Sequence, residues 1–470
     1  MTPNKPSECP HTKLVFGPSS HAVEAGYDRP NLTQRIAATT PQGSVKGIAA
    51  KFSTTKEKEQ SSTFPAPLIL PGDDLALDPT YPPQSLNSWT REKDRNSVTP
   101  KRRTVYLVAP PGLDPALEFA QKWTHPRLRA SAKEKSVDFP NIKDVLGYLA
   151  AFYHGLPVKM LPQPNPCFTA DIEEDIIEPQ TQTKGKKGVT KAAQTKSPTL
   201  WLNTHTASGC IGIRSRATPK GHFSHQVNLN DLLDAAIEIL PDDAYALIML
   251  IEHDMFEDDD DEFVCGRAYG GSRVAVVSGA RYNPILDRPQ GLERDHAWPA
   301  SHCAAYVQDC CKEVIDVDEY YASQEREKAG NKITTTEQLF TDETLTPMHA
   351  ALAAHASLPS LEYAPSIAAL EGLWLGRLCR TASHELGHCF GIDHCVYYSC
   401  AMQGTASVIE DARQPPYLCP VDLAKVLKAT GANEQDRYRS LLAFCERYKD
   451  VHLFASYKAW MTQRLGDHSS

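Results

Sequence analysis

Several features that define large classes of proteins are missing from this 470-residue sequence. It has no run of about 18 apolar residues, so we expect no segment that crosses a bilayer. Residues 1–20 contain no basic stretch followed by an apolar core, so we expect no secretory signal. The net charge is −9, and this lack of excess positive charge argues against nucleic acid or an anionic membrane as a main partner. We therefore expect a cytoplasmic location, with the nucleus as the alternative.

Cysteine is plentiful but unevenly distributed. Of the 13 cysteines, five lie between residues 379 and 419. In an intracellular chain such clustering indicates metal ligands rather than disulfides. Proline is also abundant, with 35 residues, and the N-terminal part is rich in Pro, Ser, Thr and Lys. We predict that residues 1–85 form a low-complexity, largely disordered N-terminal region.

The most informative motif is HELGHCFGIDH, from His384 to His394. On a helix, His384 and His388 project from the same face about one turn apart, which suits two imidazole ligands of one metal ion. Glu385 follows the first of these ligands and can reach a water held by that metal. Gly391 allows the positive φ at which helices commonly end, so the chain can turn back and bring His394 to the same ion. A fourth zinc position would stay open for water or substrate, as catalysis requires.

The motif alone leaves a simpler interpretation open. A bare HExxH sequence can occur by chance on an amphipathic helix with two solvent-facing histidines. Here the glycine and the third histidine have the metzincin spacing HExxHxxGxxH. Met402 follows in the segment SCAMQG, where a Met-turn would run beneath the metal, although any single methionine can be an ordinary core residue. We interpret the whole segment as a catalytic zinc site.

Three cysteines after the motif extend its resemblance to a known family. The order HExxHxxGxxHC, a second cysteine, a methionine and a distant CPx segment resembles the archaemetzincins. The resemblance is close from Thr381 to about Val426 and looser from Arg273 to Pro284. It implies a metzincin-type zinc peptidase with a second, structural zinc ion beside the catalytic one. The residues at the positions of that second site are Cys395, Cys400, Cys419 and Asp422.

One of these positions departs from the family pattern. Asp422 stands where the fourth cysteine of the second site is expected. Zinc accepts carboxylate oxygen, so a site of three cysteines and one aspartate is chemically reasonable, although thiolates hold zinc better. The alternative is that the three cysteines are buried, reduced thiols without a metal. The sequence leaves both interpretations open.

From the resemblance and the local patterns we predict an α+β, metzincin-like fold. It would contain a mixed, mostly parallel sheet, a long active-site helix that starts near Ser366, and a zinc-stapled C-terminal part. The apolar runs at residues 244–256 and 274–278 are expected to be strands of this sheet. By the resemblance, the strand at 274–278 would lie at the sheet edge and bind substrate backbone, with an ordinary core strand as the alternative.

The catalytic domain is predicted to extend over residues 86–430. Two polar stretches within it, near residues 170–199 and 285–345, are expected to be flexible insertions. Residues 431–470 are predicted to form a C-terminal helical tail, because Asn433 and Asp436 have the spacing of a helix N-terminus.

The function implied by the resemblance is zinc-dependent hydrolysis of peptide bonds. Zinc would lower the pKa of its bound water, and Glu385 would accept the water proton and deliver it to the leaving amine. The expected partner is a peptide or protein substrate of a monomeric enzyme. Two alternatives stay open: an inactive zinc-binding scaffold, against which the presence of Glu385 argues, and a zinc amidohydrolase that acts on non-peptide amides. The expected ligands of the catalytic zinc are His384, His388 and His394.

Overall fold

The computed structural model describes most of the chain. The described residues are 9, 11, 13–46, 61–127, 136–170, 199–206, 209–312 and 346–467. The predicted insertion near residues 170–199 therefore lies almost entirely outside the described residues, as does the part of the insertion at 285–345 that follows residue 312.

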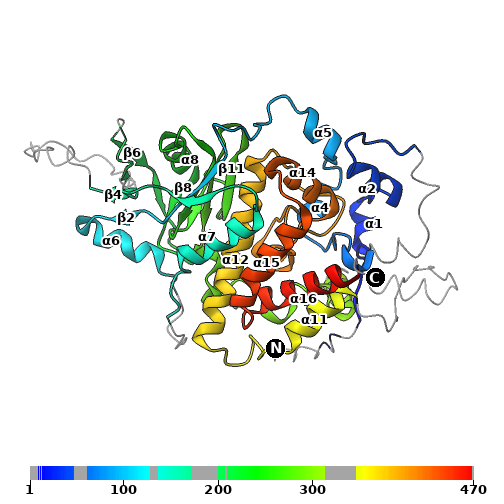
Figure 1. Ribbon diagram of the computed structural model, residues 1–470. Helices are drawn as coiled ribbons and strands as arrows, with labels where there is room; N and C mark the ends of the chain where they lie inside the picture. Colours follow the sequence, from blue (N-terminus) through cyan, green and yellow to red (C-terminus); the bar gives the residue numbers. More distant parts are fainter. Residues whose placement is uncertain are drawn as a thin grey trace, which may run out of the picture.

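A five-stranded sheet forms the centre of the molecule (Figure 1). Its strands, in spatial order, are β11 (Gly266–Tyr269), β12 (Val274–Ser278), β9 (Ala244–Ile251), β1 (Thr104–Val108) and β3 (Val158–Met160). Four strands run parallel, and β11 is antiparallel to β12. Every residue of β9 is buried, because both faces of a largely parallel sheet are covered, and this explains its uninterrupted apolar sequence. The predicted mixed, mostly parallel sheet is confirmed.

Helices cover both faces of this sheet. Alternate residues of the strands, such as Leu247 and Ile248 of β9, point to opposite faces and belong to two separate hydrophobic clusters. α12 (Ile367–Cys389) and α7 (Ile142–Phe152) lie on one face, and α8 (Leu229–Glu238) lies on the other. α12 carries the HExxH motif, so the sheet supports the candidate site from one side. Neither α12 nor any other helix in the described part of the chain is long and apolar enough to span a membrane.

One edge of the sheet differs from the prediction. β12 has a neighbour on each side, so the expectation that residues 274–278 form the edge is wrong. The edge strand is β11, which has the sequence Gly-Arg-Ala-Tyr and is partly exposed. Its sequence shows neither an apolar run nor a clear alternation, and its pairing with β12 defines it as a strand.

Two smaller sheets accompany the central one. The first has the order β2-β4-β5-β6, and the second has the order β10-β8-β7. Their strands are β2 (Gly112–Leu113), β4 (Cys167–Thr169), β5 (Leu200–Asn203), β6 (Cys210–Ile213), β7 (Ser215–Ala217), β8 (His225–Asn228) and β10 (Met255–Phe256). They lie on the side of the molecule away from the C-terminal helices (Figure 1).

The C-terminal residues form part of the main core. Asn433 caps α15 (Glu434–Arg447) by accepting a hydrogen bond from the Asp436 backbone N–H, as its spacing predicts. α16 (His452–Asp467) follows and packs along α11 (Pro347–Ala356). The buried aromatic side chains of both C-terminal helices belong to the same cluster as the sheet. The predicted tail is helical, and it is an integral layer of the molecule.

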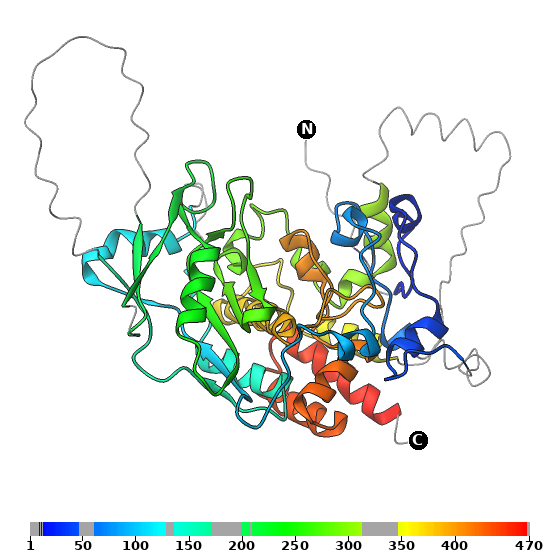
Figure 2. The ribbon, with the colours of Figure 1, turned by 90° about the horizontal axis from the view of Figure 1, so that it is seen from above.

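The N-terminal region is folded where the structure describes it. It contains α1 (His21–Ala25), α2 (Leu32–Ala38) and α4 (Asp74–Leu77). In Figure 2 the dark blue N-terminal segment runs beside the yellow-green α9 (Ala304–Lys312). The prediction of disorder is therefore wrong for the described residues before position 86. The whole apolar segment 64–70 is buried against the rest of the protein. This burial stabilises an ordered conformation, although the neighbouring sequence has only weak helical or strand periodicity.

Candidate metal centres

α12 positions the first two histidines of the candidate catalytic site. It begins after Ser366, whose hydroxyl accepts a hydrogen bond from the Ala369 backbone N–H, and it continues without a break to Cys389. Gly391 follows with a φ of +72°, a conformation that glycine adopts without strain. The chain reverses there, and His394 lies beside the helix.

The three histidine side chains meet in space. Their ring centroids are 4.7, 5.0 and 5.3 Å apart, and one ligand atom from each ring lies within 4.8 Å of the others. His384 donates from Nδ1 to the carbonyl oxygen of Ala401 at 2.7 Å. His388 donates from Nδ1 to the carbonyl oxygen of Ile392, also at 2.7 Å. These bonds place the ring protons on Nδ1 and turn the Nε2 lone pairs toward each other, with the two Nε2 atoms 3.0 Å apart.

The chemistry of this donor set fits zinc. Burial, together with the neighbouring imidazoles, holds the pKa of His384 well below its usual range. The same two causes lower the pKa of His388 to about 4, and burial also lowers the pKa of His394. All three rings are therefore neutral near pH 7, which is the state that binds a metal. Three neutral imidazoles, two of them with tautomers fixed by backbone carbonyls, match the zinc sites that keep one position open for catalysis.

Glu385 lies in a cavity that it shares with two of the histidines. The cavity has a volume of about 240 Å³. Burial raises the pKa of Glu385 to about 8, the charge of Arg267 opposes this shift, and the charge of Asp411 adds to it. A carboxyl group that titrates near neutral pH suits proton transfer in both directions. The residues that line the cavity are Phe263, Val264, Cys265, Gly266, Tyr282, Thr381, His384, Glu385, His394, Thr405, Ala406, Ser407, Val408, Asp411 and Gln414.

One acidic residue from the N-terminal region, Asp74, reaches this site. Asp74 Oδ2 lies 3.8 Å from His394 Nδ1. The Asp74 backbone N–H donates to Glu410 Oε2 at 2.8 Å, and Asp73 forms an ion pair with Arg413. No pattern in the sequence marks Asp74, because it meets the catalytic motif only through the tertiary fold.

Met402 packs directly against α12 at the turn between the two helix histidines. It is fully buried, and its carbonyl oxygen accepts a hydrogen bond from the Cys395 backbone N–H at 2.7 Å. An added Cβ on Gly387 would lie 2.7 Å from Met402 Cε and closer still to its sulfur. The absence of a side chain at Gly387 therefore makes room for the methionine one residue before His388.

A double-mutant cycle tests this contact. We expect Met402→Ala to lower the free energy of unfolding by about 2–5 kcal/mol, because it empties a buried site. Gly387→Ala alone gains about 1 kcal/mol of helix propensity but overpacks the site by about 1–3 kcal/mol. In the double variant the new methyl group fills space that the methionine vacates, so it should be more stable than Met402→Ala alone. Urea unfolding of the zinc-loaded proteins measures the cycle, and strictly additive effects would contradict the contact.

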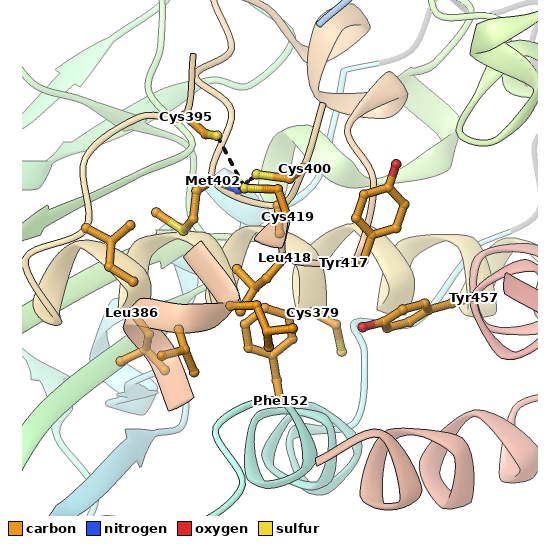
Figure 3. Packing of buried hydrophobic residues seen from close by; sticks show 14 of the residues in the cluster. Phe152, Cys379, Leu386, Cys395, Cys400, Met402, Tyr417, Leu418, Cys419 and Tyr457 are labelled. Atoms are coloured by element: carbon orange, nitrogen blue, oxygen red, sulfur yellow. Dashed lines mark hydrogen bonds between the residues drawn. The ribbon is translucent and has the colours of Figure 1, made fainter. Parts of the chain in front are cut away.

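The residues predicted to form the second site also come together. The Sγ atoms of Cys395 and Cys419 are 3.6 Å apart. Asp422, on α14 (Pro420–Thr430), places Oδ2 3.3 Å from the Cys419 sulfur and 3.5 Å from the Cys400 sulfur. All four side chains are buried, and Figure 3 shows Cys395, Cys400 and Cys419 clustered above α12. Three sulfurs and one carboxylate oxygen fit a closed zinc site with four protein ligands.

A buried lysine accompanies Asp422. Lys425 Nζ lies 2.9 Å from Asp422 Oδ1 and 2.8 Å from the side-chain oxygen of Gln84. The carboxylate is thus shared, with Oδ1 facing the ammonium group and Oδ2 facing the sulfurs. Burial raises the pKa of Asp422 to about 6; Cys395 adds to this shift and Lys425 opposes it. Gln84 also donates to the carbonyl oxygen of Gly391 at 2.9 Å, which links the second cluster to the turn after α12.

Neither Lys425 nor Gln84 is predicted from the sequence. For Lys425 a signal was available, because an aspartate and a lysine three residues apart on a helix lie on the same face. For Gln84 there was none, since it belongs to a proline-containing segment without periodicity and contacts residues more than 300 positions away.

One protein family matches the part of the chain that contains the two clusters. The model of peptidase family M54 matches residues 358–428, a segment that contains every residue predicted for the two sites. Archaemetzincin-2 from Homo sapiens is 22% identical over 382 residues, which cover 81% of this chain and 74% of the relative. Archaemetzincin-1 from Homo sapiens is 31% identical over 97 residues, or 21% of this chain and 18% of the relative.

Two solved structures also match. The crystal structure of archaemetzincin from Methanopyrus kandleri shows 16% identity and a TM-score of 0.29, and the match covers 70% of this chain and 98% of that chain. The crystal structure of a zinc-dependent peptidase from Methanocorpusculum labreanum shows 13% identity and a TM-score of 0.29, with 68% and 99% of the two chains covered.

Proposed function

Because this chain belongs to the archaemetzincin family of zinc metallopeptidases, peptidase family M54, we propose that it hydrolyses peptide bonds with Glu385 as general base and acid. The observation that carries this proposal is the position of Glu385, which is buried in one cavity with His384 and His394. A purely structural zinc site has no chemical need for a titratable carboxyl group beside its ligands.

We propose His384, His388 and His394 as the ligands of the catalytic zinc. When bound, zinc lowers the pKa of a water molecule toward neutrality and polarises a substrate carbonyl group. Backbone carbonyls orient the first two rings, as their 2.7 Å hydrogen bonds indicate. Asp74 is the group that would orient the third ring, because its carboxylate lies 3.8 Å from His394 Nδ1.

Glu385 would carry out both proton transfers. As a carboxylate it accepts the proton of the attacking water, and as a carboxylic acid it delivers that proton to the leaving amine. Burial favours its neutral form, whereas the positive charge of Arg267, and that of a bound cation, favour the carboxylate. The two forms are therefore close in free energy near neutral pH, as a group that must both accept and release a proton requires.

We propose that the substrate binds in an extended conformation along β11, in a metzincin-like manner. β11 is an edge strand, and the residues from Phe263 to Gly266 that lead into it line the cavity with Glu385. An edge strand offers backbone N–H and C=O groups that can pair with a peptide chain. The partner is accordingly an extended peptide or an unfolded segment of a protein.

We also propose a second, structural zinc ion. Its ligands would be Cys395, Cys400, Cys419 and Asp422, whose donor atoms lie within 4.8 Å of one another. Four protein ligands fill a tetrahedral zinc and leave no position for substrate. The ion would connect the turn after α12 to the start of α14 and so support the position of His394.

Removal of the metal tests the proposed activity. We expect the chelator dipicolinate to abolish cleavage of a mixed peptide library and added zinc to restore that cleavage. No side chain can take over the role of the metal in activating water. Isophthalate, the benzene analogue with the same two carboxylates but no chelating ring nitrogen, is the control. Cleavage that continues after elemental analysis shows the zinc to be gone would contradict the proposal.

A further inference from the structure

A third cluster of metal-binding side chains shares no residue with the two centres described above. Cys9, His11 and His296 each offer one ligand atom, and these atoms lie within 4.8 Å of one another. His296 is the last residue of η6 (Arg294–His296). We propose that this cluster binds a further zinc ion, which fastens the N-terminal segment to the body of the protein.

Backbone pairing holds the two segments together beside the cluster. Leu14 and Cys303 form an antiparallel β-bridge, and the Val15 backbone N–H donates to the His302 carbonyl oxygen at 2.8 Å. The two N-terminal ligands therefore lie only a few residues from a point where the chain is fixed. Their approach to His296 is built into the fold, which lowers the entropy cost of closing a metal site.

One nitrogen of each histidine in this cluster, Nε2, lacks a hydrogen-bond partner outside the cluster. Apart from the adjacent Cys9 thiol, the buried Nε2 atoms of His11 and His296 have no hydrogen-bond partner among the described residues. A buried ring nitrogen without a partner is costly, and a metal ion would satisfy both nitrogens at once. The two rings meet edge to face, with centroids 5.3 Å apart.

Glu293 supports His296 in the way that carboxylates support zinc-binding histidines. Its Oε2 lies 2.7 Å from His296 Nδ1, which fixes the ring orientation and leaves Nε2 to face the cluster. The ring also stacks on Tyr306, with centroids 4.2 Å apart and an angle of 14° between the planes. Two contacts, the hydrogen bond to Glu293 and the stack on Tyr306, thus hold the His296 ring in place.

The donor set indicates which ion binds. One thiolate and two imidazoles favour zinc over magnesium or calcium, which prefer oxygen ligands. Cys303 is buried beside Cys9 but lies outside the group of mutually close donor atoms, so a water molecule would complete the tetrahedral set around the ion. The Glu293 carboxylate is hydrogen-bonded to His296, so it adds a negative charge near the bound cation.

The ion would brace one wall of the catalytic cavity. Two residues after His296, the Trp298 backbone N–H donates to the Ala412 carbonyl oxygen at 3.0 Å. Ala412 belongs to α13 (Val408–Arg413), which supplies Asp411 to the cavity. The proposed ion stabilises this contact between the segment after His296 and α13. It contributes no group to the reaction.

The zinc content of the full-length protein tests the proposal. We expect Cys9→Ser/His11→Ala to contain one zinc ion less per chain than the parent, by elemental analysis of the folded protein. Cys310→Ser/His349→Ala is the matched control, because it removes a partly buried cysteine and histidine that belong to none of the three clusters. The control should keep the zinc content of the parent. Equal zinc content in the parent and in Cys9→Ser/His11→Ala would overturn the proposal.

A variant on the opposite segment provides a second measurement. His296→Gln should lose the same ion, and combining it with Cys9→Ser/His11→Ala should remove no further zinc. In cobalt-substituted protein that also carries His384→Ala, the thiolate-to-cobalt absorption should weaken when Cys9 is replaced by serine. An intact mass two hydrogens below that of the fully reduced chain, together with a Cys9–Cys303 disulfide and no metal at the cluster, would overturn the proposal.

Discussion

Glu385→Gln is expected to abolish peptide cleavage while the zinc content stays unchanged. Glutamine keeps the size and the buried position of the side chain, but its amide cannot accept and release a proton at neutral pH. Loss of general acid–base catalysis costs about 10²–10⁴-fold in rate, and here one group is assigned both transfers. Initial rates on a peptide library and zinc per chain by elemental analysis measure the two quantities independently.

Glu371→Gln is the matched control for this experiment. Glu371 lies on the same helix, α12, is partly buried and lines neither the cavity nor a metal cluster. The control should cleave peptides at the parent rate. A parent-like rate in Glu385→Gln would remove Glu385 from the mechanism, and loss of zinc from that variant would assign Glu385 to metal binding instead.

The parts of the site that depend on local sequence could be predicted. The common face of His384 and His388 requires only the helical period, and Gly391 marks the end of the helix through its own backbone freedom. Ser366 likewise begins α12 because its hydroxyl pairs with a backbone N–H three residues later. Each of these features involves residues within two helical turns, so the sequence alone contains the information.

The parts that depend on tertiary contacts could not be predicted. Asp74 and Gln84 meet partners more than 300 positions away, and nothing near them in the sequence indicates those partners. The apolar strand β12 resembled an accessible substrate strand, but an apolar run is typical of an interior position, and the exposed edge belongs to the less regular β11. Composition indicated disorder before residue 86 because it takes no account of the surface against which residues 64–70 are buried.

Lys425 changes the charge balance of the second cluster. Three thiolates and the Asp422 carboxylate would surround a divalent zinc ion with an excess of negative charge, and the buried ammonium group offsets part of it from 2.9 Å. A site with four cysteines has no carboxylate to share with such a lysine. If the cluster holds no metal, Asp422 serves only as the counter-ion of Lys425, and the three cysteines are ordinary buried thiols. The two interpretations predict different results for single substitutions.

Cys419→Ser should remove one zinc ion per chain and lower the free energy of unfolding by more than about 4 kcal/mol. Metal binding contributes directly to folding at a closed site, and structural zinc ions can contribute about 10–16 kcal/mol in small domains. Cys445→Ser is the control, because Cys445 is equally buried but lies outside all three clusters. It should keep the full zinc content and lose no more than about 3 kcal/mol, the cost of burying one hydroxyl group. Equal losses in the two variants, with unchanged zinc, would favour metal-free thiols.

Substitutions at Asp422 and Lys425 then decide whether the carboxylate is a ligand. Asp422→Asn replaces an anionic oxygen with a neutral amide and leaves Lys425 buried without its ion-pair partner, so we expect weaker zinc binding and a lower melting temperature. Lys425→Met removes the ammonium group but leaves the carboxylate free to bind the ion, so the zinc content should be unchanged. Competition with a chromophoric zinc chelator measures the affinity of both variants. If Asp422 is only a counter-ion, neither substitution alters zinc affinity, and Lys425→Met destabilises the protein because it leaves a buried carboxylate that neither a lysine nor a metal compensates.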